Sequence, residues 1–433
     1  MMRATRWTAP GLLVLLLASG STRAEAAHTR FDTTGRAEAV ATVTVTCERC
    51  AWDIAGREAV VLSLALDGRY VQHLPIVRTG RADYSVMLGR VEPGRHTLEL
   101  TEDAALTAGG LRGGDHARVD TIAVTQVEEG ASGYTALSLA PIVYARPNTV
   151  GRFTDVPVFM WYEREPTDRG TRYRYSMIFT NEDGGTPADR LMATWGRTLD
   201  LEYLYSVEVD RDGAILDDDI QGPEHEILAF TGRREGRHPL LWVVTENNMV
   251  LSEGSTQVRY APAPVLFPLV AVSREAVVDA HPWLYELMTQ ELAREGKIVA
   301  GAPPRHGTIP DPRRYVFFEG CGALAGQALT VAVRVGTVWF SSDRDVAEYR
   351  IVRDGCHRGA IPLPDASTIA DVRAIRVQVF GLPGKTNAAA ATLTSINTVF
   401  ALDHHFVPGG SIVTWRGTAP LLPGGAPFEL LIP

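Results

Sequence analysis

Short runs of alternating hydrophobic and polar residues dominate the chain. Residues 40–46 alternate as VATVTVT, and the apolar run AVVLSLAL at 59–66 ends at Asp67-Gly68, a typical hairpin turn. Further strand-like runs follow at spacings of about 8–12 residues, with turn residues between them. Regularly spaced short strands are typical of sandwiches, so this pattern predicts a mainly β protein of tandem β-sandwich domains.

The pattern changes between residues 263 and 310. Here apolar residues recur at intervals of three and four, forming the stripe of a helix: Leu284, Leu287, Met288 and Leu292. Pro282 suits a first helical turn and Gly296 suits the C-terminal end. The sequence therefore predicts a short helical segment between the central and C-terminal domains, followed by the proline-rich connector GAPPRHGTIPDP.

These transitions divide the chain into five parts. We expect a signal peptide, an immunoglobulin-like β-sandwich, a central β-sandwich domain with the candidate site, a helical segment with its connector, and a C-terminal β-rich domain. Their respective bounds are 1–26, 27–132, 133–262, 263–310 and 311–433. In the last part, Arg334, Arg350 and Arg376 lie in strand-like runs and are expected to face solvent.

The N-terminus has the features of a secretory signal peptide. Arg3 and Arg6 precede the apolar run GLLVLLLASG at 11–20, and Ala24-Glu25-Ala26 supplies small residues for cleavage after Ala26. An uncleaved membrane anchor is the alternative, but the apolar run is shorter than the ~20 residues that span a bilayer. We therefore expect a secreted or periplasmic protein, without a transmembrane segment after cleavage.

Composition narrows the classes of function. The 433 residues include 42 basic and 51 acidic ones, for a formal charge of −9, which argues against a general nucleic-acid-binding protein. Hydrophobic residues make up 45% of the chain, enough to build buried cores and to exclude wholesale disorder. The sequence contains no H-E-x-x-H, G-x-S-x-G or P-loop motif, so no common catalytic motif assigns a reaction.

Export changes the interpretation of the four cysteines. An even number in an oxidising compartment indicates disulfides, and the economical pairing is Cys47–Cys50 with Cys321–Cys356. The first would close a tight loop and the second would join neighbouring strands. C-E-R-C is alternatively a redox pair or half of a zinc site, but strand-like residues follow it where a thioredoxin-like motif needs a helix.

The central part contains the strongest group of candidate site residues. Asp200 and Glu202 are two apart in a strand-like run, so their side chains share one face, and His238 begins a later strand. These three residues are the candidate catalytic groups and the candidate ligands of a divalent metal. The candidate ligand-binding residues around them are Trp195, Tyr203, Glu226, Glu246 and Asn247. The alternative is an ion-paired sheet face, with Arg172, Arg174 and Arg197 as partners.

The same region resembles a known β-sandwich family. LAPIVYARPNT, YSMIFTNEDGGT, TWGRTLDLEYLYSVEV and HPLLWVVTENN follow one another over about residues 137–255, in the order found in the vacuolar protein sorting-associated group numbered sixty-two. Asp200 and Glu202 match its D-x-E positions, and His238-Pro239 matches its H-P pair. The necrosis-inducing toxins are more remote relatives of that group. The resemblance implies a metal ion at the acidic and histidine positions.

Three functions follow from these observations. The first is a secreted or periplasmic protein that binds an extracellular ligand, such as a carbohydrate, through the central domain. Its aromatic residues could stack on sugar rings: Trp161, Tyr162, Trp195, Tyr203 and Trp242. The second is a hydrolase, with or without a metal, that uses Asp200, Glu202 and His238. The third is a structural protein of the cell envelope.

Overall fold

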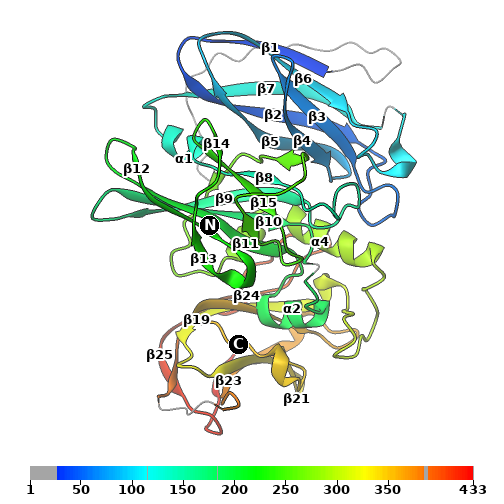
Figure 1. Cartoon of the computed structure of the whole chain (residues 1–433). Coiled ribbons are helices and arrows are strands. Elements are labelled where there is room, and N and C mark those ends of the chain that lie inside the picture. The colour runs from blue at the N-terminus through cyan, green and yellow to red at the C-terminus, as the bar shows by residue number, and fades with distance from the viewer. Residues whose placement is uncertain (1–26, 115, 183, 385–388, 433) are drawn as a thin grey trace. The chain divides into compact units, whose positions relative to one another are not determined.

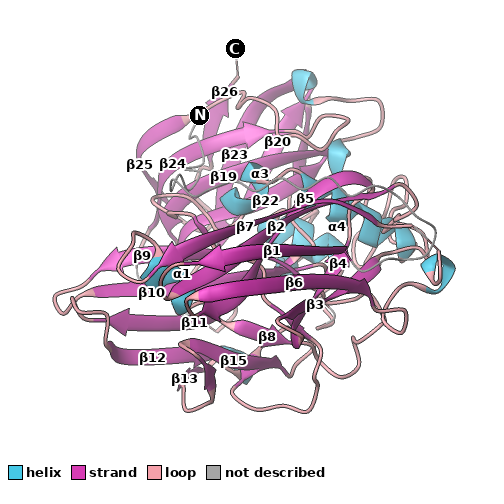
Figure 2. Cartoon of the chain, turned by 90° about the horizontal axis from the view of Figure 1, so that it is seen from above, coloured by secondary structure: helices cyan, strands magenta, loops and turns pink. Residues whose placement is uncertain are grey.

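The computed structural model of the chain describes residues 27–114, 116–182, 184–384 and 389–432 (Figure 1). Strands predominate and the helices are short (Figure 2), which confirms the prediction of tandem β domains with few helices. None of the helices in these ranges is both long and apolar enough to cross a membrane. The predicted signal peptide, residues 1–26, lies outside the described residues.

The chain divides into two compact units. Unit 1 comprises the described residues up to Ile178 together with Glu202–Leu266, and unit 2 comprises Phe179–Leu201 and the described residues from Phe267 onward. The chain therefore leaves unit 1, contributes a short segment to unit 2, returns, and leaves again. Nothing in the hydrophobic pattern indicates this excursion, and the five-part division made from the sequence stays a prediction.

The first seven strands of unit 1 form two antiparallel sheets. One has the order β1-β6-β3-β4 and the other β5-β2-β7. The strands are β1 (Ala27–Thr33), β2 (Ala37–Cys47), β3 (Val60–Leu66), β4 (Arg69–Ile76), β5 (Gly80–Val91), β6 (Gly94–Glu102) and β7 (Arg118–Glu128). The predicted turn at Asp67-Gly68 joins β3 to β4, with both residues at positive φ as such a turn requires.

Two further sheets complete unit 1. The larger has the order β13-β12-β11-β10-β9-β18, and the smaller has the order β14-β15-β8-β17, with β16 beside β15. The strands are β8 (Ile142–Tyr144), β9 (Pro157–Pro166), β10 (Thr171–Phe179), β11 (Asp200–Val209), β12 (Ile215–Gln221), β13 (Ile227–Ala229), β14 (Arg234–Glu235), β15 (His238–Val243), β16 (Val250–Leu251), β17 (Arg259–Tyr260) and β18 (Val265–Leu266). Strands β10 and β11 each have residues in both units.

Unit 2 contains a sandwich of two four-stranded sheets. Their orders are β22-β19-β24-β25 and β21-β20-β23-β26, and one apolar core lies between them. The strands are β19 (Tyr315–Ala323), β20 (Ala328–Val335), β21 (Val338–Ser341), β22 (Gly355–Pro362), β23 (Val372–Phe380), β24 (Ala391–Phe400), β25 (Trp415–Leu421) and β26 (Phe428–Leu431). Both sheets contribute branched aliphatic residues to this core, and the other faces of β20 and β23 carry polar residues, among them Thr330, Arg376 and Gln378.

Helices fill the connections. The predicted helical segment is confirmed as α3 (Ala276–Ala280) and α4 (Trp283–Arg294), with the whole apolar stripe of α4 buried and Gly296 at positive φ just after it. Two helices, α1 (Tyr134–Ser138) and α2 (Ala188–Trp195), lie in a region that the sequence pattern indicates as strands. Both are too short to give a clear helical period. The 3-10 turns are η1 (Gly109–Leu111), η2 (Pro223–His225), η3 (Pro312–Arg314), η4 (Ala347–Tyr349) and η5 (Ile369–Asp371).

Both predicted disulfides are present. Cys321 and Cys356 lie directly opposite each other in the register of β19 and β22, so their bond joins neighbouring strands as expected. Cys47 ends β2 and bonds to Cys50 across a tight loop, and both residues are fully buried. Strand β3, not a helix, follows this loop, which fits a structural role for C-E-R-C.

A candidate binding groove in unit 2

A groove of about 870 Å³ lies on the outer side of the sheet β21-β20-β23-β26. Strands β20 and β23 alternate strictly, because neighbouring side chains of a strand point to opposite faces. One set enters the core of the sandwich: Leu329, Val331, Val333, Ile375, Val377 and Val379. The other set forms the floor of the groove: Thr330, Ala332, Arg376, Gln378 and Phe380.

Strand register gives the floor its shape. Thr330 lies opposite Gln378, and Ala332 lies between Ser341 on one side and Arg376 on the other. The methyl group of Ala332 is the smallest side chain in this row, so the floor is lowest at its centre. Polar groups therefore border a shallow central depression.

Each end of the floor has an aromatic ring stacked on an arginine. The guanidinium of Arg376 lies 3.9 Å from the ring centre of Trp339, and that of Arg350 lies 3.6 Å from the ring centre of Phe380. Such contacts are attractive because the ring face is electron-rich. They also restrain both partners, so each half-exposed ring keeps a fixed orientation toward the groove.

Carboxylates hold the two stacked arginines from behind. Arg376 donates to Glu429 at 2.9 and 2.7 Å, and Arg350 donates from Nε to Asp343 at 3.0 Å. Asp343 is 3% exposed, so its bond to Arg350 is partly shielded from water. The polar groups of the groove are thus positioned before any ligand arrives, which lowers the entropic cost of binding.

One buried carboxylate of α2 anchors both walls of the groove. Asp189 Oδ2 accepts from the backbone N–H of Arg305 at 2.7 Å and from the hydroxyl of Tyr349 at 2.7 Å. Burial and the bond to Asp189 raise the pKa of Tyr349 to about 12, so its phenol stays protonated and donates. The first wall includes residues of the proline-rich connector, and the second includes Asp343, Arg344, Asp345 and Arg350.

Close packing fixes α2 at this position. A Cβ atom on Gly359 would lie 2.8 Å from the carbonyl oxygen of Ala193, so only glycine allows β22 to approach the helix this closely. The anchoring carboxylate of Asp189 is therefore placed by the main chain of two elements. Sequence reasoning missed α2, and with it the link between the two walls.

The second wall includes a tight turn with unusual backbone. Arg344 and Asp345 both have positive φ, at 50° and 64°, a conformation that costs other residues than glycine about 1–3 kcal/mol. Ser341 stabilises the turn: its hydroxyl donates to Asp343 at 2.7 Å and accepts from the backbone N–H of Arg344 at 3.1 Å. Strain of this kind clusters at binding sites.

The candidate catalytic residues lie elsewhere. Asp200 and Glu202 are in β11 and are 0% and 6% exposed, while His238, at the start of β15, is 1% exposed. Strands β11 and β15 belong to different sheets, and the groove includes none of the three residues. Within the described residues, no group of three histidine, cysteine or acidic side chains is arranged to hold a metal ion.

His238 has partners other than the candidate carboxylates. Its Nε2 lies 3.0 Å from Glu38 and its Nδ1 lies 2.8 Å from the carbonyl oxygen of Ala140. Both ring nitrogens are thereby occupied, and Glu38 comes from 200 positions earlier in the chain. A catalytic or metal-binding role shared by Asp200, Glu202 and His238 stays a prediction.

The five candidate ligand-binding residues are dispersed. Trp195 is the last residue of α2, Tyr203 donates to Asp219 across β11 and β12, and Glu226 is exposed after η2. Glu246 lies 3.8 Å from Arg146, and Asn247 contacts His225 at 3.2 Å. A joint role of these five residues in ligand binding stays a prediction.

The ion-paired alternative describes part of this region well. Arg172 donates to Ser206 and Glu208 at 3.1 and 2.8 Å and lies near Asp217 and Asp219. The guanidinium of Arg174 lies 5.9 Å from the ring centre of Tyr203, while Arg197 pairs with Glu275 at 3.3 Å. Glu208, Asp217 and Asp219 of β11 and β12 thus share Arg172 of β10 as an arginine partner within their own sheet.

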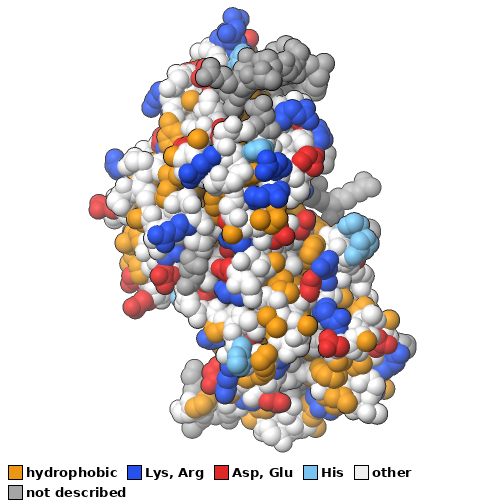
Figure 3. All heavy atoms as spheres, turned by 90° about the vertical axis from the view of Figure 1, so that its right-hand side faces the viewer, with side chains coloured by type: hydrophobic (Ala, Val, Ile, Leu, Met, Phe, Trp, Pro, Cys, Tyr) orange, Lys and Arg blue, Asp and Glu red, His pale blue; other side chains and the backbone are white. Residues whose placement is uncertain are grey.

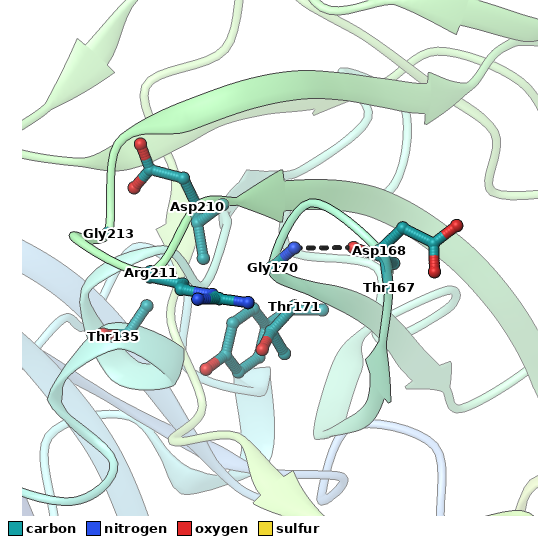
Figure 4. Close-up of a pocket in the computed structure, with 10 residues that line it drawn as sticks. Thr135, Thr167, Asp168, Gly170, Thr171, Asp210, Arg211 and Gly213 are labelled. Atoms are coloured by element: carbon teal, nitrogen blue, oxygen red, sulfur yellow. Dashed lines mark hydrogen bonds between the residues drawn. The ribbon is translucent and has the colours of Figure 1, made fainter.

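A smaller pocket in unit 1, of about 320 Å³, lies between two hairpin turns (Figure 4). Its polar groups already stabilise these turns: Thr167 accepts from Gly170 N–H at 3.0 Å, and Asp210 accepts from the N–H groups of residues 212 and 214. Figure 4 shows the carboxylates of Asp168 and Asp210 pointing away from each other. The groove in unit 2 therefore offers the better-prepared binding surface.

Comparisons with known proteins do not assign a family. No family model matches the chain, and no curated protein matches it. Among solved structures, a CBM36-1 domain of a multidomain xylanase from the hindgut metagenome of Trinervitermes trinervoides is 14% identical, with a TM-score of 0.17, over 23% of this chain and 69% of that one.

Two family 35 carbohydrate-binding modules are similar at the same level. One, from an environmental isolate, is 12% identical over 29% of this chain and 84% of its own, with a TM-score of 0.19. The other, from Clostridium thermocellum, is 13% identical over 26% and 85%, with a TM-score of 0.18. Values this low leave the function to be argued from the residues of this chain.

Proposed function

We propose that this protein binds a carbohydrate through the groove of unit 2. The observation that carries the proposal is the floor itself, where half-exposed Trp339 and Phe380 flank the polar side chains of Gln378 and Thr330. A sugar ring has an apolar C–H face that packs on an aromatic ring, and hydroxyl groups at its edge. Amide and hydroxyl side chains can donate to and accept from such groups.

We further propose that the protein acts outside the cytoplasm. The two disulfides support this location, because such bonds persist in oxidising compartments. The signal-peptide features of the N-terminus point to the same compartment. Ligand binding was expected in the central region, whereas the groove proposed here for binding lies on the sheet that contains β20, β21 and β23.

A binding experiment with two tryptophan variants tests the proposal. The purified full chain is run by affinity electrophoresis through gels containing xylan, mannan, dextran or polygalacturonate. We expect retardation by at least one polymer, and Trp339→Ala should weaken it about tenfold or more, as loss of a central aromatic contact does. Gln378→Ala should weaken it by a smaller factor.

Trp195→Ala is the matched control. Trp195 is also a half-exposed tryptophan, but it lies in α2 and was a ligand-binding candidate from the sequence. If binding survives Trp195→Ala and is lost in Trp339→Ala, the groove is supported. Loss in Trp195→Ala with full binding by Trp339→Ala would contradict it, as would absence of retardation by every polymer.

A further inference from the structure

We infer that the groove selects a carbohydrate bearing an acidic group, and that Arg344 binds this group. This inference rests on the proposed function and deepens it. Four arginines line the groove: Arg314, Arg344, Arg350 and Arg376. Their surroundings differ in one respect, which is whether a carboxylate of the protein already balances the charge.

Three of the four arginines have a carboxylate partner. Arg350 pairs with Asp343 at 3.0 Å, Arg376 with Glu429 at 2.7 Å, and Arg314 with Asp365 at 3.6 Å. Their positive charges are therefore largely balanced within the protein. They can still donate hydrogen bonds to a ligand, but their balanced charges do not favour an anionic ligand over a neutral one.

Arg344 differs from the other three. Its Nη2 donates to the carbonyl oxygen of Ala302, and within the described residues its buried Nη1 has no hydrogen-bond partner and the guanidinium forms no ion pair. A half-buried charge without a counter-charge is unfavourable because it has lost part of its hydration. An acidic group in the groove would supply the missing charge.

The neighbouring acidic residues do not take this role. Asp311 pairs with Arg313 at 2.6 Å, and the side chain of Asp345 is exposed. Asp343 is occupied by Arg350 and by the hydroxyl of Ser341. Arg344 thus remains the unbalanced cation among the charged residues of the groove, as far as the described part of the chain extends.

The tight turn holds the base of the Arg344 side chain in place. Positive φ at Arg344 and Asp345 is maintained by the bonds of Ser341 and Asp343 to the backbone. A guanidinium on a fixed stem can meet a carboxylate or sulfate with two parallel hydrogen bonds, which are stronger than bonds to neutral groups. The strained turn therefore serves to position the Arg344 side chain.

The net charge of the chain does not favour the binding of anions in general. The chain carries a formal charge of −9, and Figure 3 shows basic, acidic and hydrophobic side chains interspersed over one face of the molecule. Any preference for an acidic polymer must then come from a local site. This makes the preference sensitive to a single arginine.

Polymers that differ in charge but not in backbone test the inference. Binding of the full chain is compared for polygalacturonate and its fully methyl-esterified form, and for dextran sulfate and dextran. We expect the charged member of at least one pair to bind tenfold or more tightly, with the first pair reporting carboxylate and the second sulfate. Added salt should reduce the difference.

Arg344→Gln should remove this preference, so that the charged and the neutral member of each pair bind with similar affinity. Arg305→Gln is the matched control, because Arg305 also has positive φ in unit 2 but its guanidinium pairs with exposed Glu348 instead of lining the groove. Arg344→Lys, which keeps the charge, should retain part of the preference. Melting followed by circular dichroism confirms that each variant is folded.

The experiments distinguish failure of the acidic preference from failure of carbohydrate binding. If charged and neutral polymers bind equally and Arg344→Gln changes nothing, while Trp339→Ala abolishes binding, the acidic preference is refuted and carbohydrate binding stands. If the wild-type protein binds none of the polymers, both proposals are refuted. A preference that persists in Arg344→Gln would also refute the role of Arg344.

Discussion

Two arginine clusters, one in each unit, use the same contacts in opposite surroundings. In unit 1, Arg172 contacts Glu208, Asp217 and Asp219 with 22% of its side chain exposed. In unit 2, Arg358 donates to Asp279 at 2.5 Å and to Glu319 at 2.8 Å with 1% exposed. Ion pairing stabilises little in water, but its loss in a protein interior leaves a charge without solvent or partner.

The difference shows what each cluster contributes. Arg169 and Thr167 also bind Glu208, and the bond from Arg169 is the main cause that lowers the pKa of Glu208 to about 2. Arg172 is therefore one of several partners. Burial lowers the pKa of Arg358. The interactions with Asp279, Tyr285 and Glu319 outweigh burial and raise this pKa well above its usual value, so Arg358 stays charged. It connects α3 and β19 from within β22.

The largest expected effect is that of Arg358→Met. The substitution keeps an unbranched side chain but leaves Glu319, which is 2% exposed, without its cation. Removing one partner of a buried pair costs about 3–5 kcal/mol. Hydrogen exchange of the native protein should therefore speed up throughout β19 and β22. Unchanged exchange in these strands would contradict the comparison.

The sequence predicted those features of the fold that depend on local pattern or on composition. Alternation, the Asp67-Gly68 turn and the helical stripe of α4 are local, and each yielded the correct element. An even cysteine number and the expected export predicted disulfides, and the bond between Cys321 and Cys356 belonged to the economical pairing. These predictions depend on neighbours in sequence or on composition, which a single chain displays directly.

The candidate site could not be predicted in this way. A strand pattern tells which side chains are buried, but not which residue lies against them: Glu38 binds His238 from 200 positions away. The groove combines Trp339 and Arg376 through strand register and depends on Asp189, a residue of a short helix from the excursion of residues 179–201. Arg376 was expected to face solvent, and its stacking on Trp339 has no sequence signal.

An acid-sensitivity of unit 2 gives the next largest effect. Burial lowers the pKa of His357 to about 4, helped by Arg353 and opposed by the backbone at Gly355, against an ordinary value of 6.5. Between about pH 4 and pH 6.5, the folded state therefore binds fewer protons at His357 than the unfolded state does. The stabilisation is complete above pH 6.5 and is lost as the pH falls toward 4, by on the order of 3 kcal/mol.

Urea unfolding at pH 7 and pH 4.5 measures this loss, with hydrogen exchange in β22 as the local probe. His357→Phe removes the titrating group and keeps a ring beside Phe318. The variant should lose less stability on acidification than the wild-type protein, whatever its stability at pH 7. An equal loss in both proteins would exclude His357 as the cause.

Arg172→Met should have the smallest effect. Because Arg169 and Thr167 continue to bind Glu208, no buried carboxylate is left without a partner, and an ion pair near the protein surface contributes about 0–1 kcal/mol. Salt should reduce the difference from wild type further, since the cluster lies near water. Thermal unfolding at low and high salt, with hydrogen exchange in β10–β12, measures it. A cost near that of Arg358→Met would mean that burial does not distinguish the two clusters, and would overturn the comparison between the units.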